Sequence, residues 1–158
     1  MTLPNLPDGT LEGDTHLYAV RVYYEDTDLS GITYHANYLR WFERARSDLL
    51  RRLDIDQRAA IEAGEGAYAV ADVQMRYLRP ALLDDDIVIH TRCSELKAAS
   101  VRMVQEAKRD GETICSATFR VGFVSPNGRP RRQPEAWRHA FTRILDTSSD
   151  TSSLGEHA

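Results

Sequence analysis

Several features that would define a class of protein are missing from this 158-residue sequence. It has only two cysteines, Cys93 and Cys115, without metal-type spacing, so we expect two reduced and buried thiols. No apolar run approaches the length of a membrane span, and the first residues lack the basic and apolar segments of a secretory signal. These absences predict a cytoplasmic protein with no membrane span.

Excess positive charge is also missing. Lys and Arg total 20 against 24 Asp and Glu, which gives a net charge of −4. Because phosphate backbones bind to basic surfaces, this balance predicts no nucleic-acid partner. Outside the stretch described below, the histidines are scattered through the chain and form no metal constellation, so we expect neither a metal nor a redox cofactor.

The remaining composition is that of one globular domain. Apolar residues make up 42% of the chain and charged residues 28%, and 158 residues suffice for a real core. We find no repeat and no second domain. Residues 1–15 are predicted to be a flexible arm, residues 16–145 the domain, and residues 146–158 a disordered tail. The acidic run 84–86 lacks the pattern of a calcium loop and is interpreted as solvated charge.

One long helix and several strands are predicted from periodicity. Apolar residues recur every three or four positions from Tyr38 to Leu53, and charged residues, Asp48 among them, fall mostly on the opposite face. Asp110-Gly111 is a strong hairpin signal. Periodicity alone therefore indicates an α+β protein, with strands over 17–25, 67–78, 86–95, 100–109 and 112–124 and further helices over 56–63 and 134–145.

The most informative stretch runs from Tyr23 to Arg46. Two aspartates, Asp26 and Asp28, precede a turn, and His35 follows just before the long helix begins. A helix N-terminus offers unpaired backbone N–H groups and a partial positive charge, which can stabilise an oxyanion. A carboxylate beside such an end indicates acyl transfer or hydrolysis, with the acid as base or nucleophile.

The segment DTDLSGITYHANYLRWFERAR resembles the signature of hot-dog-fold acyl-CoA thioesterases of the 4-hydroxybenzoyl-CoA thioesterase type. It is most similar to the bacterial Tol–Pal-associated acyl-CoA thioesterases, and the resemblance covers residues 17–145, weaker after residue 46. It implies a hot-dog fold, a curved antiparallel sheet wrapped around one long central helix. It also implies an acyl-CoA thioester hydrolase that forms homodimers or homotetramers with active sites between subunits.

The resemblance implies that Asp28 is catalytic and that the backbone N–H of His35 faces the thioester carbonyl. The alternatives are that Asp28 only satisfies its own turn, and that the His35 ring moves protons or merely starts the helix. Asp26 is expected to cap the turn, and the alternative is that Asp26 is the catalytic residue in place of Asp28. Tyr34, Asn37 and Tyr38 flank the helix start and are predicted to contact substrate, although Asn37 is also a candidate N-cap.

Coenzyme A carries phosphates, so its site needs basic residues. Lys97, just before Ser100, matches the family's phosphate-binding segment, but Ala98 and Ala99 follow where some members have further basic residues. Arg129 belongs to a second basic cluster with Arg131 and Arg132. Lys97, Ser100 and Arg129 are therefore predicted to bind substrate, with solvated surface charge as the alternative.

Three functions remain open at this point. Hydrolysis of an acyl-CoA thioester is the leading hypothesis. A non-catalytic sensor of acyl-CoA or of acyl-carrier protein is the second, although an acid at position 28 would then have no purpose. Hydration of an enoyl thioester is the third, and the paired motif of Asp and His for that chemistry is not found.

Glu43, in the helical part of the signature, is interpreted as a salt-bridge partner of the neighbouring arginines.

Overall fold

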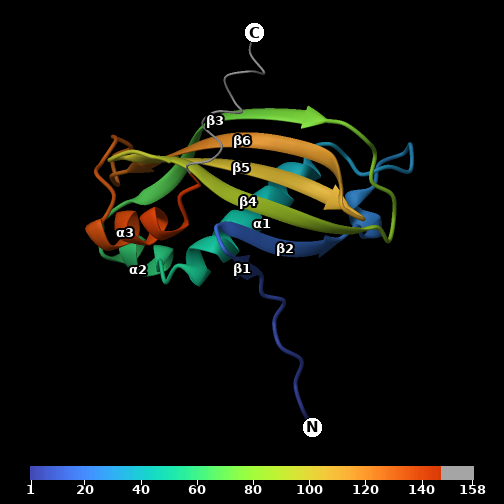
Figure 1. The fold of residues 1–158 in the computed structure, drawn as a ribbon, viewed down its shortest axis with the longest axis horizontal. Coiled ribbons are helices and arrows are strands. Elements are labelled where there is room, and N and C mark those ends of the chain that lie inside the picture. Colours follow the sequence, from blue (N-terminus) through green and yellow to red (C-terminus); the bar gives the residue numbers. More distant parts are fainter. Residues whose placement is uncertain (147–158) are drawn as a thin grey trace.

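A computed structural model describes residues 1–146, which form one curved antiparallel sheet around a central helix (Figure 1). The strand order is β1-β2-β4-β5-β6-β3. The strands are β1 (Thr10–Glu12), β2 (Thr15–Arg21), β3 (Ala67–Tyr77), β4 (Asp86–Leu96), β5 (Ser100–Arg109) and β6 (Glu112–Val124). The helices are α1 (Asn37–Arg52), α2 (Gln57–Glu62) and α3 (Glu135–Ile144), with a short 3-10 helix at Tyr24–Asp26.

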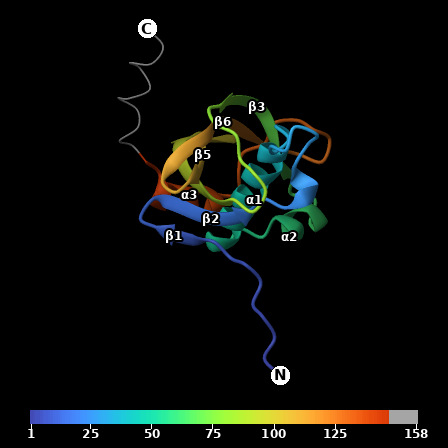
Figure 2. The same ribbon diagram turned by 90° about the vertical axis from the view of Figure 1, so that its right-hand side faces the viewer.

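Helix α1 lies in the concave face of the sheet (Figure 2). Its predicted apolar face is buried, from Tyr38 and Phe42 through Ala45 to Leu49. Sheet residues such as Phe119 close on that face, and the Phe42 and Phe119 rings meet edge to face at 5.8 Å. This arrangement confirms both the central helix and the hot-dog fold.

The sheet curves because three of its pairings shift register, one of them between Val70 and Asp72 of β3. The hairpin between β5 and β6 turns at Asp110 and Gly111, whose φ angles are 51° and 81°. Two consecutive positive φ angles are typical of a type I′ turn, and the predicted hairpin is confirmed.

Three expectations need correction at the N-terminal edge. Residues 10–12 were expected to lie in a loose arm, but they form β1 and pair with β2. Residues 23–25 were expected to continue a strand, but the chain leaves the sheet after Arg21. Asp48 was placed on the exposed face of α1, but its carboxylate is buried and accepts hydrogen bonds from His16 and from the Gly9 N–H.

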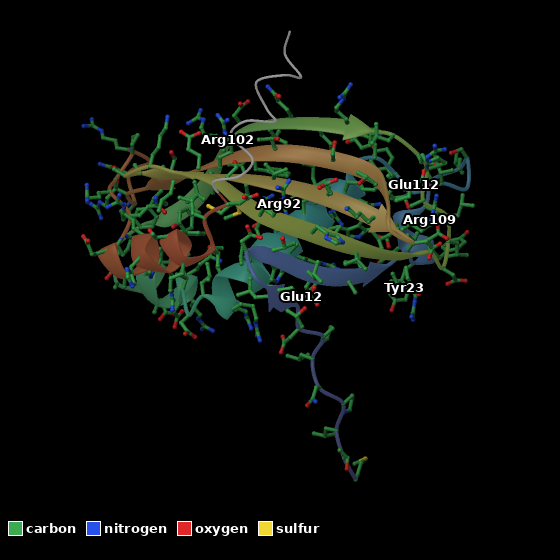
Figure 3. All side chains as sticks on the ribbon, in the orientation of Figure 1. Glu12, Tyr23, Arg92, Arg102, Arg109 and Glu112 are labelled. Atoms are coloured by element: carbon green, nitrogen blue, oxygen red, sulfur yellow. The ribbon has the colours of Figure 1, made fainter. Side chains whose placement is uncertain are left out.

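The outer face of the sheet is polar, as the labelled Arg92 and Arg102 illustrate (Figure 3). Arg92 pairs with Asp146 at 2.8 Å, so the packed structure extends one residue beyond the predicted domain boundary. Asp85, in the acidic run interpreted as solvated, instead pairs with Arg109 at 2.8 Å.

Within residues 1–146 no helix is long and apolar enough to span a membrane.

Both cysteines are free and buried, as predicted. Burial raises the pKa of the Cys93 thiol and of the Cys115 thiol to about 12. Thiols with such pKa values carry almost no thiolate at neutral pH, so neither is a nucleophile here.

Candidate active site

The loop that carries the two aspartates is a small hairpin fixed at both ends. Thr27 and Thr33 form an isolated bridge, and the Asp28 N–H donates to the Ile32 carbonyl at 2.9 Å. Gly31, at φ 83°, occupies the left-handed position of the turn. The Thr33 N–H donates to the Ala81 carbonyl at 2.8 Å, which ties the loop to the segment before β4. Asp28 is therefore held on a rigid loop.

The Asp28 carboxylate is half engaged. Its Oδ1 accepts hydrogen bonds from the Ser30 N–H at 2.8 Å and from the Ser30 hydroxyl at 2.5 Å. Its Oδ2 has no partner among residues 1–146, and the side chain is exposed. The Ser30 hydrogen bonds, with a smaller contribution from His35, hold the pKa of Asp28 below its usual 3.8. At neutral pH the Asp28 carboxylate is thus ionised, with one oxygen held by Ser30 and the other free to act.

The hydrogen bonds of Asp26 stabilise the loop itself. Its Oδ2 accepts a hydrogen bond from the Tyr23 N–H at 2.8 Å, which confirms the expected turn cap. Its backbone carbonyl accepts from the Tyr34 N–H and from the Asn37 side-chain amide, both at 2.8 Å. The Asn37 side chain therefore does not cap α1, and its predicted capping role is wrong. Its amide is instead used to hold the loop against the helix start.

Two adjacent backbone donors are free at the start of α1. The Asn37 N–H donates to the Tyr34 carbonyl and the Leu39 N–H to the Ala36 carbonyl. The N–H groups of His35 and Ala36, just before Asn37, have no acceptor within residues 1–146. Unpaired N–H groups at a helix N-terminus favour negative charge on an approaching oxygen. The structure joins these donors to the Asp28 loop, because the Asp26 carbonyl accepts from the Tyr34 N–H and from the Asn37 side-chain amide.

Aromatic rings surround this helix start. The His35 ring lies between the rings of Tyr34 and Tyr77, with centroids at 4.5 Å and 6.0 Å. Tyr38 is buried against Trp41 and Tyr77, and burial raises its pKa to about 12. Tyr77 was missed by the sequence reasoning. Alternation along residues 73–77 could have placed it on the helix side of the sheet, but not beside the helix start.

The predicted phosphate-binding residues lie at the opposite end of the sheet. Strand β4 begins just after the segment that holds the Asp28 loop, and Lys97 follows its last residue, so about 30 Å separates them. Lys97 pairs with Glu95 at 3.2 Å, and its N–H donates to the Ser100 carbonyl. Arg129 has no carboxylate partner among the described residues. Within one chain these residues do not join Asp28.

The two predicted phosphate-binding segments do join each other. The buried Gln133, which follows the arginine cluster, donates its backbone N–H to the Ala98 carbonyl at 2.9 Å. Its side-chain amide donates to the Lys97 carbonyl at 2.9 Å, and its amide oxygen accepts from the Tyr68 hydroxyl. One buried glutamine therefore holds both basic segments beside the first residues of β3.

A pocket opens at this same end, between α1, α2 and the inner face of the sheet. One wall is polar: Arg46 pairs with Glu43, donates to the Gln105 side chain at 2.9 Å and lies 4.1 Å from the Phe119 ring centre. The Glu43 salt bridge is thus confirmed. No sequence signal pointed to the pocket, because its wall comes from five elements. Its lining is Glu43, Arg46, Ser47, Leu50, Gln57, Tyr68, Val70, Val101, Met103 and Val121.

The pocket and Asp28 do not share a cavity in a single chain. Ser47 lies ten residues after Asn37, which corresponds to about 15 Å along the helix axis. Within residues 1–146 no group of three or more acidic, histidine or cysteine side chains could hold a metal ion. The candidate site therefore consists of a fixed carboxylate, free backbone donors and aromatic walls.

Comparison with known proteins gives consistent results. The thioesterase-like superfamily matches residues 22–145. Acyl-CoA thioesterase YbgC of Haemophilus influenzae is 37% identical over 127 residues, covering 77% of this chain and 93% of that protein. Acyl-CoA thioester hydrolase YbgC of Escherichia coli O157:H7 is 36% identical over 121 residues, covering 75% and 90%. The crystal structure of a probable thioesterase from Bartonella henselae has 33% identity and a TM-score of 0.72, covering 76% and 99%.

Proposed function

Because the chain belongs to the thioesterase-like superfamily, we propose that it hydrolyses an acyl-CoA thioester to a free acid and CoA. In this proposal Asp28 is the catalytic carboxylate. One observation carries the assignment of Asp28. Its Oδ1 is anchored by Ser30 while its Oδ2 is open, on a loop beside the free N–H groups of His35 and Ala36. The sensor function would need no such ionised and half-free carboxylate.

The proposed reaction begins when the thioester oxygen accepts hydrogen bonds from the free N–H groups at the start of α1. These donors stabilise the negative charge that grows on that oxygen in the transition state. The backbone of His35 is sufficient for this role, and its ring completes an aromatic wall with Tyr34 and Tyr77.

Asp28 can then act in either of two ways. As a general base it takes a proton from water while the hydroxide oxygen bonds to the acyl carbon. The C–S bond breaks, and the CoA thiolate takes that proton. As a nucleophile Asp28 bonds to the acyl carbon itself, CoA thiolate leaves, and water hydrolyses the resulting anhydride. Both routes consume one water and return Asp28 as a carboxylate, and neither needs a cofactor.

The complete site is proposed to form between two copies of the chain. Strand β3 is an edge of the sheet with no neighbour on its outer side within residues 1–146. Its inner-face side chains Val70, Val73 and Tyr77 are exposed, although they pair with buried residues of β6. Edge strands with exposed apolar side chains readily pair with another chain. A second copy adding its β3 to this edge would cover them.

Such a pairing would also assemble the separated parts. Tyr77, at the end of β3, contacts His35, whereas Tyr68, near its start, lines the pocket. Antiparallel pairing of two β3 strands about a two-fold axis brings the end of one to the start of the other. Asp28 of one protomer would then lie beside the partner's pocket and basic cluster. The pocket would hold the acyl group, and Lys97, Ser100 and Arg129 would lie near the CoA phosphates.

The function is tested by free-thiol release from a panel of short aliphatic, long aliphatic and aromatic acyl-CoAs. We expect release from at least one class, without added metal or cofactor, by a homodimer or homotetramer. Calorimetry on the same panel detects the alternative. Tight binding of an acyl-CoA without hydrolysis of any acyl-CoA in the panel would favour the sensor of acyl-CoA or acyl-carrier protein.

We further propose a cytoplasmic location without a nucleic-acid partner, on the charge and composition given above.

A further inference from the structure

Tyr77 ends strand β3 beside the start of α1, and its hydroxyl has a specific partner. The hydroxyl donates a hydrogen bond to the His35 carbonyl at 3.2 Å. The Tyr77 ring meets the His35 ring edge-on at 6.0 Å and the Tyr38 ring at 5.7 Å. These three contacts fix the position of the Tyr77 hydroxyl.

The carbonyl that Tyr77 holds belongs to the peptide unit that carries a free donor. The His35 carbonyl and the Ala36 N–H share one plane and point in opposite directions, because the peptide bond is planar and trans. Fixing that carbonyl therefore fixes the direction of the Ala36 N–H. Within residues 1–146 the Tyr77 hydroxyl is the only hydrogen-bond partner of the His35 carbonyl. Nothing else described there sets this peptide plane by a hydrogen bond.

The same hydrogen bond strengthens the donor. A peptide whose carbonyl accepts a hydrogen bond is polarised, and its N–H becomes a better donor on the other side. The neighbouring peptide follows the same pattern: the Tyr34 carbonyl accepts from the Asn37 N–H, and the His35 N–H of that unit is free. Two successive peptide units thus have an engaged carbonyl and an open N–H.

We infer that Tyr77 is a positioning residue whose hydroxyl holds the His35–Ala36 peptide so that the Ala36 N–H becomes the second oxyanion donor. This inference rests on the proposed thioesterase function. It also connects the edge of the sheet to the reacting centre, because Tyr77 is fixed by its register with Cys115 of β6. The strand proposed to pair with a second copy therefore carries the side chain that orients the site.

The test uses Tyr77→Phe, which keeps the ring packing and removes only the hydroxyl. Loss of one neutral hydrogen bond should lower kcat by about 2- to 13-fold, which corresponds to about 0.5–1.5 kcal/mol. KM should stay within about twofold, because the acyl and CoA contacts lie elsewhere. Tyr18→Phe is the matched control, since the Tyr18 hydroxyl on β2 has no hydrogen-bond partner in the described chain. Its kcat should equal that of the unmodified protein.

A second measurement separates this role from general packing. In the substrate-free protein, the Ala36 amide proton resonance should move upfield in Tyr77→Phe, because its peptide loses polarisation. The resonances of residues in the middle of α1 should not move. An unchanged kcat, or a lowered kcat with an unmoved Ala36 resonance, would overturn the inference. An unmodified protein that hydrolyses no acyl-CoA would overturn the proposed function as well, and the Ala36 shift would still report whether the peptide link exists.

Discussion

At the scale of single residues, the environment of Asp28 explains how one exposed carboxylate can hold its own turn and still be available for the proposed reaction. Sequence reasoning treated the turn and the chemistry as alternatives, but the two carboxylate oxygens divide these roles. Oδ1 accepts from Ser30 and Oδ2 stays open. Ser30 could be seen in the sequence only as a turn residue. Its effect on the pKa of Asp28 depends on the side-chain geometry within that turn.

Substituting Ser30 should change the pH profile of the enzyme. The active form of Asp28 is the carboxylate, so kcat/KM is lost as pH falls through the pKa of Asp28 in the free enzyme. The Ser30 hydroxyl is the largest cause that holds this pKa below 3.8. In Ser30→Ala the acidic limb of kcat/KM should therefore move to higher pH. Ser116→Ala, on β6 away from the site, should leave the limb in place, whereas an unmoved limb in Ser30→Ala would contradict the account.

At the scale of elements, local signals predicted what local interactions determine. The 3.6-residue periodicity predicted α1, and Asp110-Gly111 predicted the β5–β6 hairpin. Strand β1 was missed because three residues carry no recognisable alternation, and its pairing comes from β2. Asp48 was assigned to the exposed helix face because its buried partner, His16, lies 32 residues earlier in the chain. Such long-range partners leave no signal in the spacing of residues.

The His16–Asp48 pair is expected to make stability depend on pH. His16 is fully buried, its Nε2 lies 2.6 Å from Asp48 Oδ2, and its Nδ1 has no partner in the described chain. Burial, the largest effect, lowers the pKa of His16 below 6.5, although Asp48 opposes this and Arg52 adds to it. The unfolded chain therefore binds more protons than the folded chain as pH falls below about 6.5. Stability is present above that pH and declines below it.

Thermal unfolding at a series of pH values between neutral and mildly acidic measures this effect. Tm should fall as pH decreases through this range. His16→Gln can still donate to Asp48 but does not titrate, so its Tm should fall less steeply. His139→Gln, at an exposed position of α3, should keep the original slope. A His16→Gln slope equal to that of the unmodified protein would show that His16 does not cause the dependence.

At the scale of the whole molecule, the two parts of the proposed site lie at opposite ends of the sheet of a single chain. The resemblance to known thioesterases implied sites between subunits, but composition and periodicity could not supply this arrangement. It follows from where the Asp28 loop, the pocket and the basic cluster lie along β3, β4 and β6. Their separation explains why residues predicted to share one site do not meet in one chain.

A charge on the inner face of β3 tests this assembly. Val73 is exposed and sits opposite the buried Phe119 of β6, so it faces the side that a second copy would cover. Val73→Asp should keep the circular dichroism of the fold, shift light scattering to a monomer and lose thioesterase activity. Thr118→Asp, on the outer face of β6, should remain oligomeric and active. A monomeric Val73→Asp protein with full activity would contradict a site shared between protomers.

The most direct measurement compares Asp28→Asn with Asp26→Asn on the best acyl-CoA substrate. Asparagine keeps the size of the side chain and can accept the hydrogen bond from Ser30 or from Tyr23, but it is neither a base nor a useful nucleophile. For Asp28→Asn we predict unchanged substrate affinity by calorimetry and a fall in kcat of at least ~10²-fold. Asp26→Asn should fold equally well and keep most of its activity. An active Asp28→Asn enzyme would contradict Asp28 as the catalytic carboxylate, and an inactive Asp26→Asn enzyme together with an active Asp28→Asn enzyme would transfer that role to Asp26.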